Sequence, residues 1–199
     1  IAYSSRPHEV LRRARATMTP ATREAIAQTR RSVIVCDSYQ LRMLQHSRHD
    51  PRTTLEHMAR LADVVAVVVG AGQTPGETIG NGRAIAATFA REGALVLCVD
   101  RVESRADETV ASIRSNGGFA EPCVADITPS DECDALARAA LDRWGRIDVL
   151  VNNVGIGGRG DGPAHSADDD AFDRILDVNL RAMWRTCRAV LPTMRERVQ

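Results

Sequence analysis

The chain has 199 residues and a formal net charge of zero, and all 26 of its basic residues are arginine. It contains no apolar run long enough to span a bilayer, and its apolar stretch at 33–36 is too short for a signal peptide, so we expect no membrane association. Its five cysteines are widely spaced, without a Cys-x-x-Cys pair or a Cys/His cluster. We therefore expect reduced thiols, no metal site and a cytoplasmic protein.

The zero net charge conceals a split between two parts of the chain. Residues 1–57 carry ten arginines against five acidic residues, whereas residues 58–199 carry sixteen against twenty-one. We predict a basic, poorly ordered extension over 1–57, or a product of upstream translation, and a separate domain over 58–199. The charge would also suit an arm for nucleic acid, but the scattered arginines and the presence of only two aromatic residues, Tyr3 and Tyr39, argue against it.

A strand, a glycine loop and a helix come next. Residues 64–69 form a Val-rich run bounded by glycine, which predicts a parallel strand buried on both faces. The loop from Gly70 to Gly82 leads into a helical segment over 83–92, closed by Gly93. Glycines let the backbone approach a phosphate closely, and the first N–H groups and positive dipole end of the helix favour its charge. The segment therefore predicts a phosphate site.

A second strand over 94–99 ends in Asp100, close to the spacing of about twenty residues seen in dinucleotide-binding folds. A carboxylate there can accept both hydroxyls of an adenosine ribose and repels a 2′-phosphate. We therefore expect NAD as the cofactor. NADP stays open, because Arg101 beside the carboxylate could pair with the extra phosphate.

The remaining segments continue the alternation of helices and strands. We predict a helix over 102–116, a third strand ending in 124–128, a helix through Trp144 with Thr128 as its N-cap and Pro129 at its first position, and a fourth strand over 149–151. The last helix, over 171–188, carries apolar residues at three- and four-residue spacing.

Four features of this pattern occur together in one family. They are the glycine loop, Asp126 after the third strand, Asn152-Asn153-Val154-Gly155 after the fourth, and Asn179 in the last helix. In this order the chain from about Met58 resembles the first part of a short-chain dehydrogenase/reductase. The resemblance implies an α/β fold with a Rossmann-type doubly wound parallel sheet, here truncated after the fourth strand and the following helix.

The resemblance also implies roles for individual residues. Asn179 would support a water-linked proton relay and is the one catalytic candidate. The residues expected to bind the cofactor follow the molecule from pyrophosphate through adenosine to the nicotinamide ribose: Gly70, Gly80, Asn81, Gly82; Asp100, Arg101, Asp126, Ile127; Asn153, Gly155. Taken singly, Asp100, Asp126 and the asparagines could be ordinary turn formers, so it is their combination that favours a cofactor site.

The glycine loop departs from the family pattern in two ways. Val69 stands where the family has threonine, and ten steps separate Gly70 from Gly80 instead of four, which indicates a six-residue insertion over 73–78. Divergent enoyl reductases also lengthen this loop, but the Asn-Asn-Val-Gly and Asp-Val-Asn-Leu segments suit the ordinary dehydrogenase branch better. Glu77 would be unfavourable beside a pyrophosphate unless it points to solvent.

The catalytic serine, tyrosine and lysine of the family are missing from the chain as given. There is no lysine, and the only tyrosines precede the first cofactor strand. Arginine would not replace that lysine, and without the acid/base a bound nicotinamide has no proton partner. We therefore expect a fragment of an NAD(P)-dependent oxidoreductase acting on an alcohol or carbonyl substrate, inactive alone.

Two further expectations follow from the resemblance. Loss of the later strands would leave the fourth strand as an unpaired sheet edge. The helix that carries Asn179 forms a subunit interface in the family, so a homo-oligomer through it is also implied. The alternative function is a non-catalytic module that binds a dinucleotide or pairs with a partner.

Overall fold

The computed structural model describes residues 33–35, 60–76 and 78–196. The chain divides after Arg31, and every described residue belongs to the unit Ser32–Gln199. The expectation that residues 1–57 lack order falls outside the described residues, except at residues 33–35, which form a strand. The predicted boundary at residue 58 stays a prediction.

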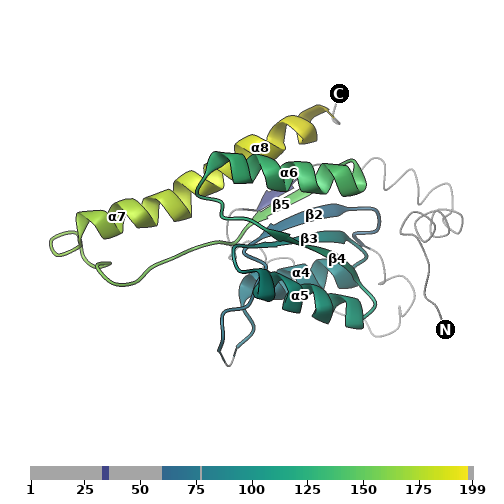
Figure 1. Ribbon diagram of the computed structural model, residues 1–199, viewed down its shortest axis with the longest axis horizontal. Helices are drawn as coiled ribbons and strands as arrows, with labels where there is room; N and C mark the ends of the chain where they lie inside the picture. Colours follow the sequence, from purple (N-terminus) through teal and green to yellow (C-terminus); the bar gives the residue numbers. More distant parts are fainter. Residues whose placement is uncertain (1–32, 36–59, 77, 197–199) are drawn as a thin grey trace, which may run out of the picture. The chain divides into compact units, whose positions relative to one another are not determined.

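Strands and helices alternate as in an α/β fold (Figure 1). The strands are β1 (Val33–Val35), β2 (Val65–Val69), β3 (Leu95–Asp100), β4 (Phe119–Val124) and β5 (Val149–Asn152). The helices are α4 (Asn81–Arg91), α5 (Glu103–Ser115), α6 (Ser130–Trp144), α7 (Asp169–Leu176), the π-helix η1 (Asp177–Arg181) and α8 (Ala182–Glu196).

The five strands form one parallel sheet in the order β1-β5-β2-β3-β4. Because the order reverses between β2 and β5, helices cover both faces, which confirms the doubly wound parallel sheet. The predicted free edge at the fourth strand is wrong. β1 pairs with β5 from Val33↔Val149 to Val35↔Val151, so the strand predicted to be exposed has hydrogen-bonded neighbours on both sides.

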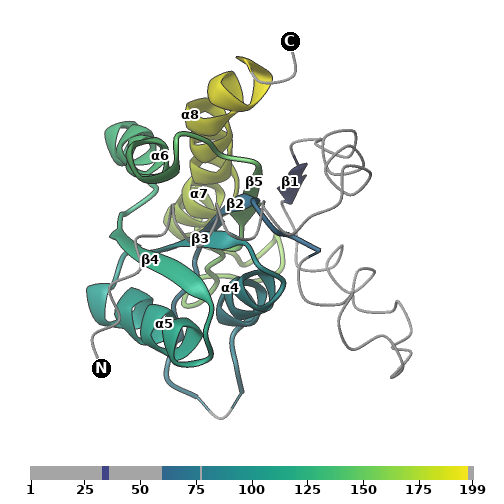
Figure 2. The ribbon, with the colours of Figure 1, turned by 90° about the vertical axis from the view of Figure 1, so that its right-hand side faces the viewer.

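Helices α4 and α5 lie on one face of the sheet and α6 and α8 on the other (Figures 1 and 2). Side chains of β2 alternate between the two resulting cores: Val68 packs with Ile85 and Phe89 of α4, and Val67 with Leu136 of α6. Every residue of β2 is at most 1% exposed, which confirms the predicted doubly buried strand. This rigid centre fixes the loops at the carboxyl ends of the strands.

Two local predictions need correction. Pro129, not Thr128, occupies the N-cap position of α6, because the Thr128 hydroxyl donates instead to Asp126 Oδ1 at 2.7 Å. The last helix is also not one regular helix over 171–188: it begins at Asp169, passes through the π-turn η1 and continues beyond Pro192 to Glu196. A π-turn inserts one extra residue and rotates the side chains that follow it.

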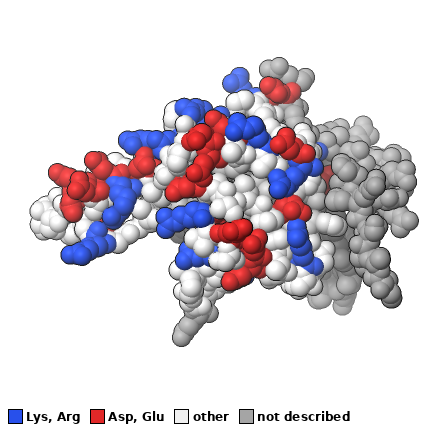
Figure 3. Space-filling model, in the orientation of Figure 1, with Lys and Arg blue, Asp and Glu red and all other residues white. Residues whose placement is uncertain are grey.

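No helix in the described part of the chain is long and apolar enough to cross a membrane. On the face drawn in Figure 3, arginines of the described residues lie interspersed with aspartate and glutamate. A nucleic-acid surface would instead present a field of one sign. The possible nucleic-acid arm over residues 1–57 falls outside the described residues, apart from 33–35, so this face does not test it.

Candidate functional site

A cleft of about 530 Å³ lies at the carboxyl ends of the parallel strands. All ten residues predicted to bind the cofactor line it. Asn179 does not line it, although its neighbour Val178 does. Parallel α/β sheets bind ligands at this end, where the strand order reverses. The structure thus brings the predicted residues together, whereas their individual roles stay predictions.

The floor of the cleft depends on glycines at two close approaches. Gly70 has φ +79° in the left-handed region, and a Cβ placed on Gly82 would lie 1.8 Å from the Gly70 carbonyl oxygen. Asn153 Nδ2 donates to the same oxygen at 3.2 Å. Side chains would separate the strand end from the helix here, so glycine at both positions keeps the first turn of α4 against the cleft.

Among the described residues, no acidic side chain belongs to the first turn of α4. The N-cap residue of this helix, Gly80, offers no side-chain cap. By contrast, α7 begins with an Asp168 carboxylate that accepts from Asp170 N, and α6 carries Asp131 and Glu132 in its first turn. The carboxylates at the starts of α6 and α7 offset the positive dipole ends of those helices, whereas the start of α4 has no acidic residue of its own. A phosphate would be stabilised there.

Asp100 is held by the backbone on both sides of its carboxylate. Oδ2 accepts from Gly72 N and Oδ1 from Val102 N, each at 3.0 Å. A Cβ on Gly72 would lie 2.3 Å from Asp100 Oδ2, so only glycine allows this contact. Arg101 and Arg105 line the same end of the cleft. The site therefore combines a fixed carboxylate with two nearby cations.

The inserted loop is closed by Gln73, a residue that sequence reasoning gave no role. Its Oε1 accepts from Gly80 N at 2.7 Å, and its Nε2 donates to the carbonyls of Thr78 at 2.8 Å and Thr74 at 3.0 Å. One side-chain amide thus spans the insertion and ties it to the start of α4. A long amide side chain among glycines was the available signal. Glu77 lies outside the described residues.

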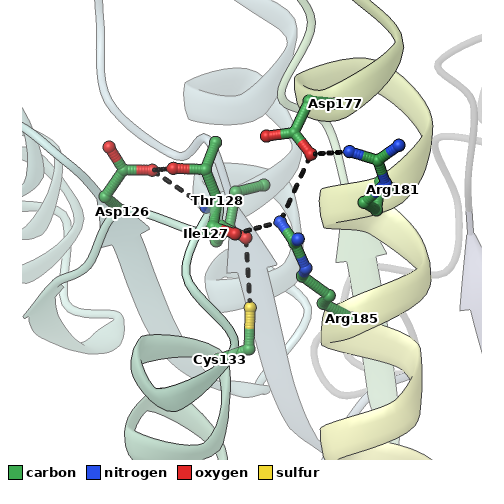
Figure 4. A network of polar contacts seen from close by, with 7 residues as sticks. All are labelled: Asp126, Ile127, Thr128, Cys133, Asp177, Arg181 and Arg185. Atoms are coloured by element: carbon green, nitrogen blue, oxygen red, sulfur yellow. Dashed lines mark hydrogen bonds and ion pairs between the residues drawn. The ribbon is translucent and has the colours of Figure 1, made fainter. Parts of the chain in front are cut away.

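The turn after β4 is ordered around Asp126. Its Oδ1 accepts from Thr128 N at 2.9 Å and from Thr128 Oγ1 at 2.7 Å (Figure 4). These backbone and side-chain hydrogen bonds hold the pKa of Asp126 below its usual value. Ile127, at 6% exposure, packs into the core and presents its remaining surface to the cleft.

Asn179 lies in the π-turn and clamps the backbone of Ile156 with two hydrogen bonds. Its Oδ1 accepts from Ile156 N and its Nδ2 donates to Ile156 O, each at 2.8 Å. The clamp fixes the loop that leaves β5 and passes along the cleft. The predicted relay role is not tested by this geometry, but the side chain's structural task is evident.

Asn152, the last residue of β5, and Asn153, which follows it, have different contacts. Asn153 faces the cleft and Gly70, whereas Asn152 is 4% exposed and faces α8, because successive strand side chains point to opposite sides. Asn152 Oδ1 accepts from Thr186 Oγ1 at 2.7 Å, and its Nδ2 donates to Cys187 Sγ at 3.5 Å. Sequence reasoning missed Thr186, whose partner is remote in the chain.

The cysteines of the described residues are free thiols, as expected. Burial raises the pKa of Cys98 to about 12 and that of Cys133 to about 11. Such thiols stay protonated at neutral pH and are poor nucleophiles. Among the described residues no cluster of His, Cys, Asp and Glu could hold a metal ion.

A comparison with models of protein families shows which family the chain belongs to. The model of the short chain dehydrogenase family matches residues 64–199, well over half of the chain. The chain belongs to this family. Its members are oxidoreductases, and the match starts at the strand that precedes the glycine loop. The resemblance found in the sequence motifs is thereby confirmed.

Individual relatives agree over the same region. An uncharacterized oxidoreductase of Bacillus subtilis is 38% identical, over 70% of this chain and 48% of its own length. A carboxyl-CoA reductase of Mycobacterium tuberculosis, named for a hydroxy-methyl-oxo-hexahydroindene substrate, is 38% identical over 73% of this chain and 53% of its own. The chain therefore spans about half the length of the relatives it matches.

Solved structures give the same result. A short-chain dehydrogenase/reductase from Burkholderia xenovorans superposes with a TM-score of 0.66 at 40% identity, covering 70% of this chain and 54% of that one. A metagenomic short-chain oxidoreductase in complex with NADP superposes with a TM-score of 0.61 at 36% identity, covering 69% of this chain and 59% of that one. A 7α-hydroxysteroid dehydrogenase in complex with NADH and 7-oxo glycochenodeoxycholic acid superposes with a TM-score of 0.60 at 34% identity, covering 69% of this chain and 51% of that one.

Proposed function

We propose that the cleft binds a nicotinamide dinucleotide. The observation that carries the proposal is that ten residues chosen from sequence line one cleft, beside a helix start that no carboxylate of the described residues caps. The pyrophosphate would lie against Gly80, Asn81 and Gly82, with the adenosine toward Asp100 and the nicotinamide toward Asn153. Two structural neighbours that hold NADP and NADH support this assignment.

NAD is the preferred form in this proposal. The Asp100 carboxylate is held in place by two amides, so it can accept the adenosine ribose hydroxyls without rearrangement and would repel a 2′-phosphate. Arg101 and Arg105 line the same region and favour the opposite preference. Because two hydrogen bonds fix the Asp100 carboxylate in place, its preference for NAD is taken to outweigh the opposite preference of the two arginines.

The proposed activity is oxidoreduction of an alcohol or carbonyl, carried out by the complete family member. The bound nicotinamide would supply hydride transfer. The residues of this chain would bind and orient it: the glycines admit the pyrophosphate, Asp100 selects the ribose, and the Asn179 clamp on Ile156 holds the loop beside the nicotinamide end. Asn179 is also the proposed support of the proton relay.

The chain as given is proposed to be inactive by itself. It has no lysine, and both of its tyrosines precede the first strand of the proposed cofactor site. Titration with NADH, followed by an assay with a panel of aliphatic and steroid ketones, tests both halves of this statement. Saturable binding without NADH oxidation is expected. Turnover above that of a Gly82→Ala control would overturn the inactivity.

A second candidate function is pairing through the helix that carries Asn179. Large apolar side chains lie exposed along one line of α7, η1 and α8, with 57% exposure at Phe172, 62% at Leu180 and 57% at Trp184. Asp168, Asp169 and Asp170 begin this helical stretch. Two exposed arginines, Arg188 and Arg195, lie toward its C-terminal end. Two copies packed antiparallel would bring opposite charges together and bury the apolar line.

Light scattering after gel filtration tests this pairing. The proposal expects a dimer that dissociates in the variant Leu180→Glu/Trp184→Glu. Phe119→Glu, which changes an exposed apolar residue on the distant edge strand β4, serves as the matched control and should remain dimeric. A monomer at high protein concentration in the unmodified chain would contradict the pairing and leave dinucleotide binding as the only candidate.

A further inference from the structure

The turn at the adenosine end of the cleft is held from two helices at once. The Ile127 carbonyl accepts from Cys133 Sγ of α6 at 3.3 Å, and the Thr128 carbonyl accepts from Arg185 Nη1 of α8 (Figure 4). A thiol is a weak donor, whereas a guanidinium makes charge-assisted hydrogen bonds. Of the two anchors, Arg185 is therefore the stronger.

Arg185 is itself fixed by a carboxylate. Its Nη1 lies 3.5 Å from Asp177 Oδ1, and the side chains of Arg185 and Asp177 are only 22% and 30% exposed. Arg181 donates to the same oxygen at 2.8 Å but is 61% exposed and, among the described residues, makes no hydrogen bond to the turn. The two arginines thus share one carboxylate, while only Arg185 reaches the Thr128 carbonyl.

Asp177 opens the π-turn that carries Asn179, whose side chain clamps Ile156 at the other end of the cleft. A continuous set of polar contacts therefore runs from Asp126 through Thr128 and Arg185 to this π-turn. Residues of the continuous helical stretch η1 and α8 thus hold the backbone at both ends of the cleft. The helix is held independently by buried residues such as Ala182 and Val190, so it can serve as a fixed support.

We propose that Arg185 is a positioning residue for the adenine-side turn of the dinucleotide site. It holds the Thr128 carbonyl so that Asp126 and Ile127 keep the spacing that accepts an adenine. The inference rests on the proposed dinucleotide function and adds a residue that touches no part of the cofactor, because Arg185 is absent from the residues lining the cleft.

The test compares Arg185→Met with Arg181→Met in the full 199-residue chain. Methionine keeps an unbranched stem suited to a helix and removes the charge in both variants. Dissociation constants are measured for NADH, and for AMP and nicotinamide mononucleotide by displacement of NADH fluorescence. Arg185→Met should raise the dissociation constants of NADH and AMP about tenfold and change that of nicotinamide mononucleotide by less than about twofold. Arg181→Met should change none of the three by more than about twofold.

Rescue distinguishes positioning from general destabilisation. Arg185→Lys, which keeps a charged donor, should recover most of the AMP affinity, although a single ammonium cannot reproduce the guanidinium geometry. If Arg185→Met fails to fold, Arg185→Gln replaces it, with the same selective loss for AMP expected.

Unchanged AMP affinity, or equal weakening of AMP and nicotinamide mononucleotide, overturns the role of Arg185. Failure of the unmodified chain to bind NADH is a separate result. It would refute the proposed function itself, and the positioning role would fall with it.

Discussion

Replacement of Gly82 by alanine should disrupt the cleft from its centre. The added Cβ would lie 1.8 Å from the Gly70 carbonyl oxygen and 2.7 Å from Asn153 Nδ2. The first contact is with backbone at the carboxyl end of β2, so no side-chain rotation relieves it, and the start of α4 must move by about 1 Å or more. Overpacking of this kind costs about 1–3 kcal/mol, and more where backbone must shift.

The matched control is Gly162→Ala, outside the residues that line the cleft. A Cβ at Gly162 meets nothing closer than Ser166 Oγ at 3.8 Å, so the same chemical change should alter stability by less than about 0.5 kcal/mol. Thermal unfolding followed by circular dichroism should show a midpoint lower by about 2–12 °C for Gly82→Ala, because 1 kcal/mol corresponds to about 2–4 °C at this size. NADH binding should be lost as well.

A Gly82→Ala variant with an unchanged unfolding midpoint would refute the packing argument. A variant that is destabilised yet binds NADH with the affinity of the unmodified chain would preserve the packing argument. It would, however, refute the assignment of the pyrophosphate to this helix start. The two readouts therefore separate the structural claim from the functional one.

Three further outcomes are expected. Asp100→Asn should weaken NADH binding about tenfold and reduce or reverse the preference for NADH over NADPH, measured by fluorescence titration with both cofactors. An unchanged ratio of the two dissociation constants would contradict the role of the carboxylate. Gln73→Ala removes three hydrogen bonds from the inserted loop and should weaken NADH several-fold with little change in unfolding midpoint; equal affinity would show that loop closure is unimportant. Thr128→Val should raise the pKa of Asp126 toward its ordinary value, as measured by carbon NMR of the carboxyl group. Because the pKa of Asp126 is lower in the folded than in the unfolded chain, the corresponding stabilisation is present above the unfolded-state pKa and is lost as the pH falls through the folded-state pKa. An unchanged pKa in the variant would contradict the assigned hydrogen bond.

The sequence was sufficient where a signal is local. The valine run of β2, the glycines of the loop and the acidic stop at Asp100 each impose a backbone requirement within a few residues. Their positions in one parallel unit then follow from the way strands and helices alternate. For this reason all ten predicted residues meet in one cleft.

It was insufficient where the partner is remote. Val33–Val35 is a three-residue apolar segment within a basic stretch, and nothing near it indicates pairing with β5 more than a hundred residues later. Arg185 has the same difficulty, since its acceptor is a main-chain carbonyl 57 positions away. The π-turn around Asn179 adds one backbone residue to a helix whose apolar spacing still fits a regular period.

Calorimetric titration of the 199-residue chain with NADH and NADPH decides whether the cleft binds a nicotinamide dinucleotide. We expect saturable binding at one site per chain, tighter for NADH than for NADPH, abolished by Gly82→Ala and retained by Gly162→Ala. Absence of saturable binding for both cofactors in a folded chain would contradict the proposed function.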